Sequence, residues 1–265
     1  MLDSATVKYY RNLFKKYLEG KELNEELVDY VVNHKNGWLR NVFRHYIQYL
    51  YYKRVITPEL FGWLMEIVPS RGYKLDVRPY QIKLEDLLKT LRFLRENHET
   101  YYLVYRLMLE SGARVSHALL LLSSWNPHEQ VSVATIGLES ERLVCFEEKG
   151  FCRYYLGIKS VQKPCEWVYM STETADAISR TAPVSIDRSS IRKYAKRHGL
   201  LSPKTMRKLS WRFMVQTMPR EVARFVQSRF GELGISEARY EDLLKSADEY
   251  YSRYLSTLIS QYLMR

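Results

Sequence analysis

The side chains in this chain that could do chemistry are basic and phenolic, and six of them form one candidate set: Arg114, Lys149, Lys204, Arg207, Arg229 and Tyr240. Guanidinium groups bind phosphate oxygens through paired hydrogen bonds and can stabilise the charge that builds on them during attack. A tyrosine hydroxyl can act as the nucleophile, and a lysine can protonate the leaving oxygen. The set therefore predicts attack on a DNA phosphodiester with a phosphotyrosine intermediate, which conserves the bond energy and lets the strand religate without ATP.

Arg114 stands in an unusual setting within "MLESGARVSHALLLL", residues 108–122. Two apolar helical pieces are joined by Ser111-Gly112-Ala113, and Arg114 follows the break directly. A charge beside four consecutive leucines is costly unless its guanidinium meets an anion. That anion could be the scissile phosphate, or a carboxylate in a buried salt bridge with Glu110 or Glu139.

Several other kinds of site have no support in the sequence. There is no glycine-rich nucleotide-binding motif, no HExxH and no Gly-x-Ser-x-Gly elbow, and the six histidines are scattered. Cys145, Cys152 and Cys165 make an odd count without a CxxC pair, which predicts neither a zinc site nor a disulfide framework and favours a cytoplasmic location. We therefore expect no metal and no cofactor.

The overall charge points to a polyanionic partner. The formal net charge is +11 and the isoelectric point is about 9.4, which favours nucleic acid first and an anionic membrane surface second, although a merely basic protein is the alternative. No run of 18 apolar residues is present, and the N-terminal residues lack the apolar core of a signal peptide. We expect double-stranded DNA as the partner and no membrane.

The elements that must position the candidate residues divide near residue 75. Residues 1–68 are predicted to be helical throughout, with Asn24 and Thr57 as N-caps and Pro58 at the first helical position. Helical spacing puts three polar residues on one face that could lie along a DNA groove or simply face solvent: Arg40, Arg44 and Gln48. The basic segment 69–83 resembles a linker, and three of its residues are further candidates for DNA contact: Arg71, Lys74 and Arg78.

The second part begins with two helices, and the pattern then changes. Four short stretches rich in Val, Ile, Tyr and Phe predict strands: "QVSVATIGL", "ERLVCFEE", "FCRYYLGI" and "EWVYMS". Lys149-Gly150 lies between two of them and predicts a tight turn. Helices return from Ser171. We expect a mainly helical α+β chain, with an all-helical DNA-binding domain at 1–75, a linker at 76–84, and a domain of helices around a small antiparallel sheet at 85–265.

Taken together, these motifs resemble those of the tyrosine recombinases, or phage-type integrases, and in particular the integrases of archaeal viruses and plasmids. "SGARVSHALLL" is similar to the first arginine box, and "PKTMRKLSWRFM" to the second, with Lys204 where most members have histidine and Arg207 as the second arginine. "FVQSRFG" places Arg229 where histidine or tryptophan is usual, and "EARYEDLL" offers Tyr240 eleven residues later.

The resemblance implies a role for each of these residues. Tyr240 would be the nucleophile, the three arginines would hold the scissile phosphate, and Lys149 would be the hairpin lysine that acts as general acid, with Lys159 and Lys163 as alternatives in the same region. It also implies a tetramer acting on two DNA duplexes without metal. A type IB-like topoisomerase, or a non-catalytic DNA-binding protein with this fold, remains an alternative.

The final segment, residues 246–265, has the apolar spacing of an amphipathic helix. It could pack on its own domain. The resemblance suggests instead that it docks on a neighbouring protomer and links the ring. On that second reading, truncation after Asp248 is expected to leave the monomer folded.

Overall fold

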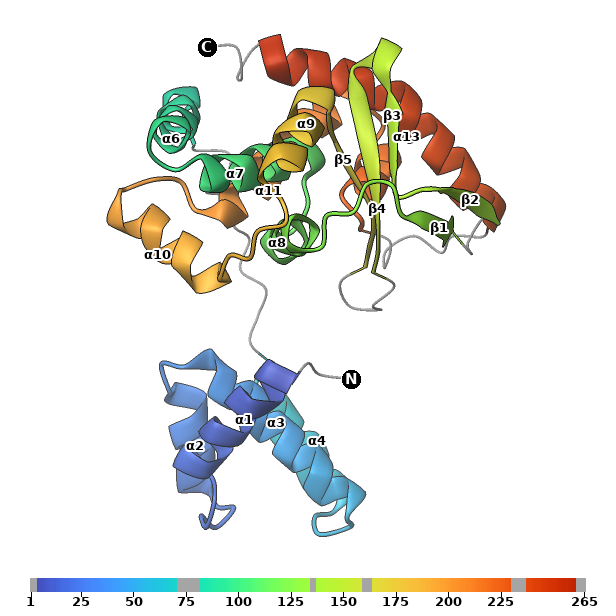
Figure 1. Ribbon diagram of the computed structural model, residues 1–265. Coiled ribbons are helices and arrows are strands. Elements are labelled where there is room, and N and C mark those ends of the chain that lie inside the picture. Colours follow the sequence, from blue (N-terminus) through green and yellow to red (C-terminus); the bar gives the residue numbers. More distant parts are fainter. Residues whose placement is uncertain (1–3, 71–81, 134–136, 159–163, 230–236, 261–265) are drawn as a thin grey trace. The chain divides into compact units, whose positions relative to one another are not determined.

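The computed structural model describes residues 4–70, 82–133, 137–158, 164–229 and 237–260, and the chain forms two compact units, Met1–Asp76 and Val77–Arg265 (Figure 1). The boundary between the units falls at the start of the predicted linker. Arg71, Lys74 and Arg78, predicted to contact DNA, lie outside the described residues. No helix within the described ranges is long and apolar enough to cross a bilayer.

The N-terminal unit is built from four helices: α1 (Ser4–Tyr17), α2 (Glu25–Asn33), α3 (Gly37–Tyr52) and α4 (Pro58–Ile67). The predicted caps are confirmed, because the Asn24 side chain accepts from the Leu27 amide at 2.9 Å and Thr57 accepts from the Leu60 amide at 3.3 Å. One side of α3 is buried in the unit's own core, which also holds residues of the other three helices.

The C-terminal unit follows the predicted order of helices, strands and helices, so the mainly helical α+β class is confirmed. Its helices are α6 (Leu84–Asn97), α7 (Glu99–Ser111), α8 (Val115–Ser123), α9 (Thr172–Thr181), α10 (Arg188–Arg197), α11 (Pro203–Thr217), α12 (Arg220–Val226) and α13 (Glu237–Leu258). Its strands are β1 (Gln130–Val133), β2 (Leu138–Glu141), β3 (Leu143–Phe146), β4 (Phe151–Ile158) and β5 (Cys165–Ser171).

The strands form two small antiparallel sheets rather than the single sheet that the sequence predicted. β1 and β2 pair with each other, while β3, β4 and β5 form a three-stranded sheet with β4 in the middle. β5 is buried along its whole length. This explains why "EWVYMS" has no polar alternation, since both of its faces are covered.

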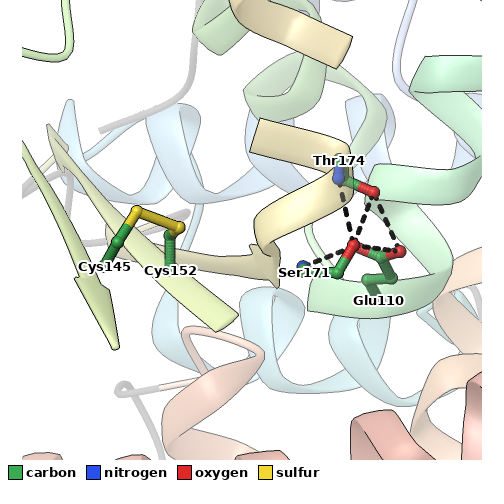
Figure 2. Close-up of a disulfide and its surroundings, with 5 residues drawn as sticks. All are labelled: Glu110, Cys145, Cys152, Ser171 and Thr174. Atoms are coloured by element: carbon green, nitrogen blue, oxygen red, sulfur yellow. Dashed lines mark hydrogen bonds between the residues drawn. A yellow bond between two sulfur atoms is a disulfide. The ribbon is translucent and has the colours of Figure 1, made fainter. Parts of the chain in front are cut away.

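The prediction of no disulfide is wrong for Cys145 and Cys152, which are joined across β3 and β4 (Figure 2). The predicted turn at Lys149-Gly150 is in fact longer, with a 3₁₀ turn at Glu147–Lys149 and Gly150 in the left-handed region at φ 70°. This longer turn brings Cys145 directly opposite Cys152 in the strand register. The cysteine-based argument for a cytoplasmic location therefore no longer holds.

Helix α7 is the central helix of the C-terminal unit, and it is buried on nearly every side. Its Glu110, with no exposed surface, accepts from the Ser171 amide at 2.9 Å, the Ser171 hydroxyl at 3.1 Å and the Thr174 hydroxyl at 2.9 Å (Figure 2). It also accepts from the Arg106 guanidinium at 2.8 Å. Arg106 also pairs with Glu173 at 2.6 Å. A buried carboxylate with four donors is stable only as a complete network, so these bonds fix α7 to the end of β5 and the start of α9.

Helix α13 packs within its own unit, alongside the three-stranded sheet (Figure 1). Asp248 forms an ion pair with Arg153 and accepts from the Tyr169 hydroxyl at 3.0 Å. Further along, the Tyr251 hydroxyl donates to the Glu110 carbonyl at 3.2 Å and the Tyr254 hydroxyl to the Leu109 carbonyl at 2.6 Å. The packing alternative therefore describes α13 up to Leu258, and this packing argues against the expectation that a chain ending at Asp248 would stay folded.

We predict that truncation after Asp248 abolishes cooperative unfolding of the C-terminal unit. It removes Tyr251, Tyr254, Leu255 and Leu258, all at most 3% exposed. Each large core side chain that is lost costs about 2–5 kcal/mol. Together, losses at these residues are comparable to or larger than the ~5–15 kcal/mol that stabilises a typical domain. Thermal unfolding followed by circular dichroism tests this, and a truncated chain with a sharp transition near that of the full chain would contradict it.

A matched pair of point variants tests whether this part of α13 contributes to the core. Leu255 is 3% exposed and Leu120 is 43% exposed. We expect Leu255→Ala to lower the free energy of unfolding by about 2–4 kcal/mol and Leu120→Ala by less than about 1 kcal/mol. Equal losses in chemical denaturation would mean that this part of α13 does not belong to the core.

Candidate active site

The position of Arg114 is fixed by the break between α7 and α8. Gly112 ends α7 in the left-handed conformation at φ 65°, and the Ala113 amide donates to the Ser111 hydroxyl at 3.0 Å. Arg114 is then the N-cap residue of α8, and its Nη1 donates to the Pro164 carbonyl at 3.2 Å. Glu110, considered above as a salt-bridge partner, is instead held by Arg106. Burial lowers the pKa of the half-buried Arg114 guanidinium.

Arg207 lies on α11 and reaches back to the same break. Its Nη1 donates to the Gly112 carbonyl, and its Nη2 donates to the Gln227 carbonyl at 2.9 Å. Burial, reinforced by the positive charges of Arg114 and Arg229, lowers the pKa of Arg207 to about 9. The guanidinium still carries its proton near neutral pH, and an added anion would relieve the repulsion among the three cations.

Arg229 follows α12 and completes the cluster through Gln227. The Arg229 Nε donates to the Gln227 side-chain oxygen at 3.0 Å, and the guanidinium lies 4.6 Å from the ring centre of Trp211. Gln227 is fully buried, and its own amide nitrogen donates to the Arg207 carbonyl at 3.2 Å. This glutamine therefore holds both arginines, a role that sequence reasoning missed because nothing in its spacing sets it apart.

The arginine cluster, by which we mean Arg114, Arg207 and Arg229, has one property that matters for function. Among the described residues, the carbonyls of Pro164, Gly112 and Gln227 hold Arg114 and Arg207, and an amide oxygen contacts Arg229. Carbonyl and amide oxygens orient a guanidinium without neutralising it. The cluster is therefore arranged to receive an anion with several oxygens, as a phosphate has.

Tyr240 lies in the first turn of α13 and is 4% exposed. Its hydroxyl donates to the Glu166 carboxylate and accepts from the Trp167 indole nitrogen at 2.9 Å. Burial, followed by the hydrogen bond to Glu166 and its charge, raises the pKa of Tyr240 well above its usual value. Glu166 and Trp167 directly follow Pro164 and Cys165 on the chain, so the structure brings the tyrosine to the end of β5 that Arg114 contacts.

A pocket of about 500 Å³ opens next to the cluster and is lined by Arg114, Arg207 and Lys204. Lys204 is exposed in the first turn of α11. The loop before it is fixed by two bonds at Leu201, whose carbonyl accepts from the Tyr105 hydroxyl at 2.7 Å and whose amide donates to the Thr90 hydroxyl at 3.2 Å. The sequence missed two further lining residues on α10, Arg188 and Arg192.

The structure places Lys149 at the opposite end of β4 and β5 from this cluster. Strand β4 pairs Phe151 with Ser171 near Lys149, and pairs Ile158 with Cys165 at the opposite end, near Arg114. Ser171 is four positions further along β5 than Trp167, roughly 13 Å away, and Trp167 is the residue that contacts Tyr240. The Lys149 amine instead donates to the Asp248 carbonyl at 3.4 Å. The alternatives Lys159 and Lys163 lie outside the described residues.

The three described residues of the N-terminal unit that were predicted to bind DNA all have contacts within that unit. Arg44 donates to the Met65 and Val68 carbonyls at 2.6 Å, and Arg40 donates to the Val32 carbonyl at 3.1 Å. These bonds cap the ends of α4 and α2. Gln48 is exposed and contacts His45 at 3.2 Å. Their contact with DNA stays a prediction.

In the part of the chain that the structure describes, no three His, Cys, Asp or Glu side chains are grouped closely enough to hold a metal ion. Positive charge in the pocket comes from arginine and lysine.

We predict that Gly112→Ala disrupts the arginine cluster. A Cβ at Gly112 would lie 2.3 Å from the Gln227 amide nitrogen, so the Gln227 side chain must move away and lose its bonds to the Arg207 main-chain carbonyl and to the Arg229 guanidinium. Gly150 is the matched control, because it has a similar φ of +70° but open space around its Cβ position. We expect Gly150→Ala to lose only the about 1–2 kcal/mol of left-handed strain, and Gly112→Ala to lose more.

The readouts are the free energy of unfolding and the rise in melting temperature that sulfate produces over chloride at equal ionic strength. The rise should be smaller in Gly112→Ala than in Gly150→Ala, since only the former perturbs the anion site. Equal stability and equal sulfate response in the two variants would contradict the close packing of Gly112 on Gln227.

The chain resembles the crystal structure of a lambda integrase (75–356) dimer bound to a COC′ core site, with a TM-score of 0.53 and 12% sequence identity over 86% of this chain and 88% of that one. At that identity the similarity shows the fold. No curated protein sequence matches the chain. The archaeal phage integrase family model matches residues 79–257, which include every residue of the cluster and Tyr240, and the chain therefore belongs to the archaeal phage integrase family.

Proposed function

We propose that this protein is a site-specific DNA recombinase that cleaves and rejoins double-stranded DNA through a 3′-phosphotyrosine intermediate, without ATP or metal. The observation that carries the proposal is the arginine cluster at the end of β5 where Tyr240 lies, in which main-chain carbonyls orient Arg114 and Arg207 and the Gln227 amide oxygen contacts Arg229. Such a cluster stabilises the charge that develops on a scissile phosphate during in-line attack.

In the proposed reaction the Tyr240 oxygen forms a bond to phosphorus while the bond from phosphorus to the 5′ oxygen breaks. The geometry offers Glu166 as acceptor of the Tyr240 proton, since the hydroxyl already donates to its carboxylate. A lysine gives a proton to the departing 5′ oxygen. Attack of a 5′ hydroxyl on the phosphotyrosine reverses these steps and rejoins the strand, and a 5′ hydroxyl from a second duplex would exchange partners.

The fold and family support DNA as the partner, because the lambda integrase of similar fold is bound to a core site. By the family resemblance we propose a tetramer on two duplexes, acting inside the host cell. The N-terminal unit would add phosphate contacts through Gln48 and neighbouring basic residues. A type IB-like topoisomerase is the alternative enzyme, and it would relax any supercoiled plasmid, whereas a recombinase requires its own sites.

We predict that the intact protein forms a covalent adduct with a nicked suicide substrate carrying its site, and that EDTA does not reduce the yield. Arginine side chains supply the charge that a metal would otherwise provide. Tyr240→Phe should abolish the adduct. Tyr250→Phe is the matched control on the same helix and should retain it. Adduct loss in EDTA, or an adduct that survives in Tyr240→Phe, would refute the proposed site.

A second prediction concerns the general acid. We expect Lys149→Ala to leave cleavage within about twofold, because Lys149 lies near Asp248 rather than near Tyr240. Either Lys159→Ala or Lys163→Ala should slow cleavage by about 10²–10⁴, the usual contribution of a general acid. A substrate with sulfur in place of the scissile 5′ oxygen should rescue that variant, since a thiolate leaves without a proton. A large, sulfur-rescued defect in Lys149→Ala would restore the original assignment.

A further inference from the structure

The pocket beside the arginine cluster holds more positive charge than one phosphate needs. Five charged residues line it, all of them cations: Arg114, Arg188, Arg192, Lys204 and Arg207. No carboxylate is among its described lining residues. Arg114 and Arg207 belong to the cluster, which leaves the α10 pair without an assigned ligand.

Arg188 and Arg192 are one helical turn apart on α10, so they share a face, while Ile191 and Ala195 are buried on the inner side. Neither guanidinium forms an ion pair or hydrogen bond with another residue in the described part of the chain. The carboxylate next in sequence, Asp187, is used as the helix N-cap and accepts from the Ser190 amide at 3.0 Å.

Several other arginines of the C-terminal unit do have carboxylate partners. Arg106, Arg142 and Arg153 each pair with a carboxylate, at 2.8 Å to Glu110 for Arg106 and 2.7 Å to Glu129 for Arg142. Two arginines without such partners, facing a pocket that already contains three cations, repel one another unless an anion enters. DNA supplies such anions in series, because each strand carries one phosphate per about 3.4 Å of helix axis.

We infer that Arg188 and Arg192 form a second phosphate site, which binds a backbone phosphate flanking the scissile one. This inference rests on the proposed function, since it takes Arg114 and Arg207 as ligands of the scissile phosphate. The pair binds and positions the strand and takes no part in bond making. Loss of the pair therefore weakens DNA binding and raises KM more than it lowers kcat.

The test uses the full chain in a Tyr240→Phe background, so that strand cleavage does not contribute to measured binding. The Arg188→Ala/Arg192→Ala double variant is compared with Lys193→Ala/Arg197→Ala, which also removes two positive charges four residues apart on α10. Lys193 and Arg197 are exposed but do not line the pocket. Circular dichroism checks that both remain folded. Removal of one phosphate contact should weaken affinity about tenfold and reduce the slope of log K against log salt by about 0.9.

Neutral methylphosphonates, placed singly at each phosphate flanking the scissile one, identify the ligand. At one position the methylphosphonate should weaken DNA binding by the parent protein as much as the double substitution does. At that position it should have little further effect on DNA binding by the double variant. The Lys193/Arg197 variant should still lose affinity there in full. Arg188→Lys/Arg192→Lys should recover part of the affinity.

Two outcomes would overturn the inference. One is that the double substitution and the methylphosphonate reduce the free energy of DNA binding additively at every flanking position. The other is that both double variants lower affinity and salt slope equally. Failure of the proposed function is distinguishable, because it would appear as absence of an adduct in the protein that retains Tyr240, whereas these binding measurements need no cleavage.

Discussion

The structure of the C-terminal unit depends on one electrostatic constraint, the convergence of three guanidinium groups, of which Arg114 and Arg207 pair with no carboxylate among the described residues. Arg114, Arg207 and Arg229 are oriented by main-chain carbonyls and by the Gln227 amide. Dipoles of this kind hold a cation in place while leaving its charge available. Burial, reinforced by the repulsion that remains, lowers the pKa of Arg207 to about 9, and a bound phosphate would relieve that repulsion.

This constraint explains features that otherwise look unrelated. Gly112 must lack a side chain because Gln227 occupies the space next to it, and its carbonyl must point at Arg207. Glu110, only two residues earlier, is removed from the site by its bonds to Arg106, Ser171 and Thr174. A carboxylate this close to the break would neutralise Arg114 if it were free, so the buried network keeps the cluster cationic as well as fixing α7.

The nucleophile segment is tied to the same core. Tyr240 contacts Glu166 and Trp167 on β5, and eight residues later Asp248 pairs with Arg153 on β4. Tyr251 and Tyr254 then bond to carbonyls at the end of α7. The helix that carries the tyrosine is thus packed against both the sheet and the helix that leads to Arg114. The same core therefore positions the proposed nucleophile and the first arginine.

The sequence by itself determined the local structure and the chemical class of the site. Helix caps at Asn24 and Thr57, the break before Arg114 and the strands around residues 130–171 follow from short-range preferences, and the arginine and tyrosine boxes stand in a fixed order. Only the tertiary structure decided which residues meet. A longer turn than expected joined Cys145 to Cys152, the strand register moved Lys149 away from Tyr240, and burial kept α13 in its own unit. Register, turn length, the partners of Glu110 and Gln227, and the place of Arg188 and Arg192 beside the pocket depend on segments distant along the chain, and periodicity within one segment carries no information about them.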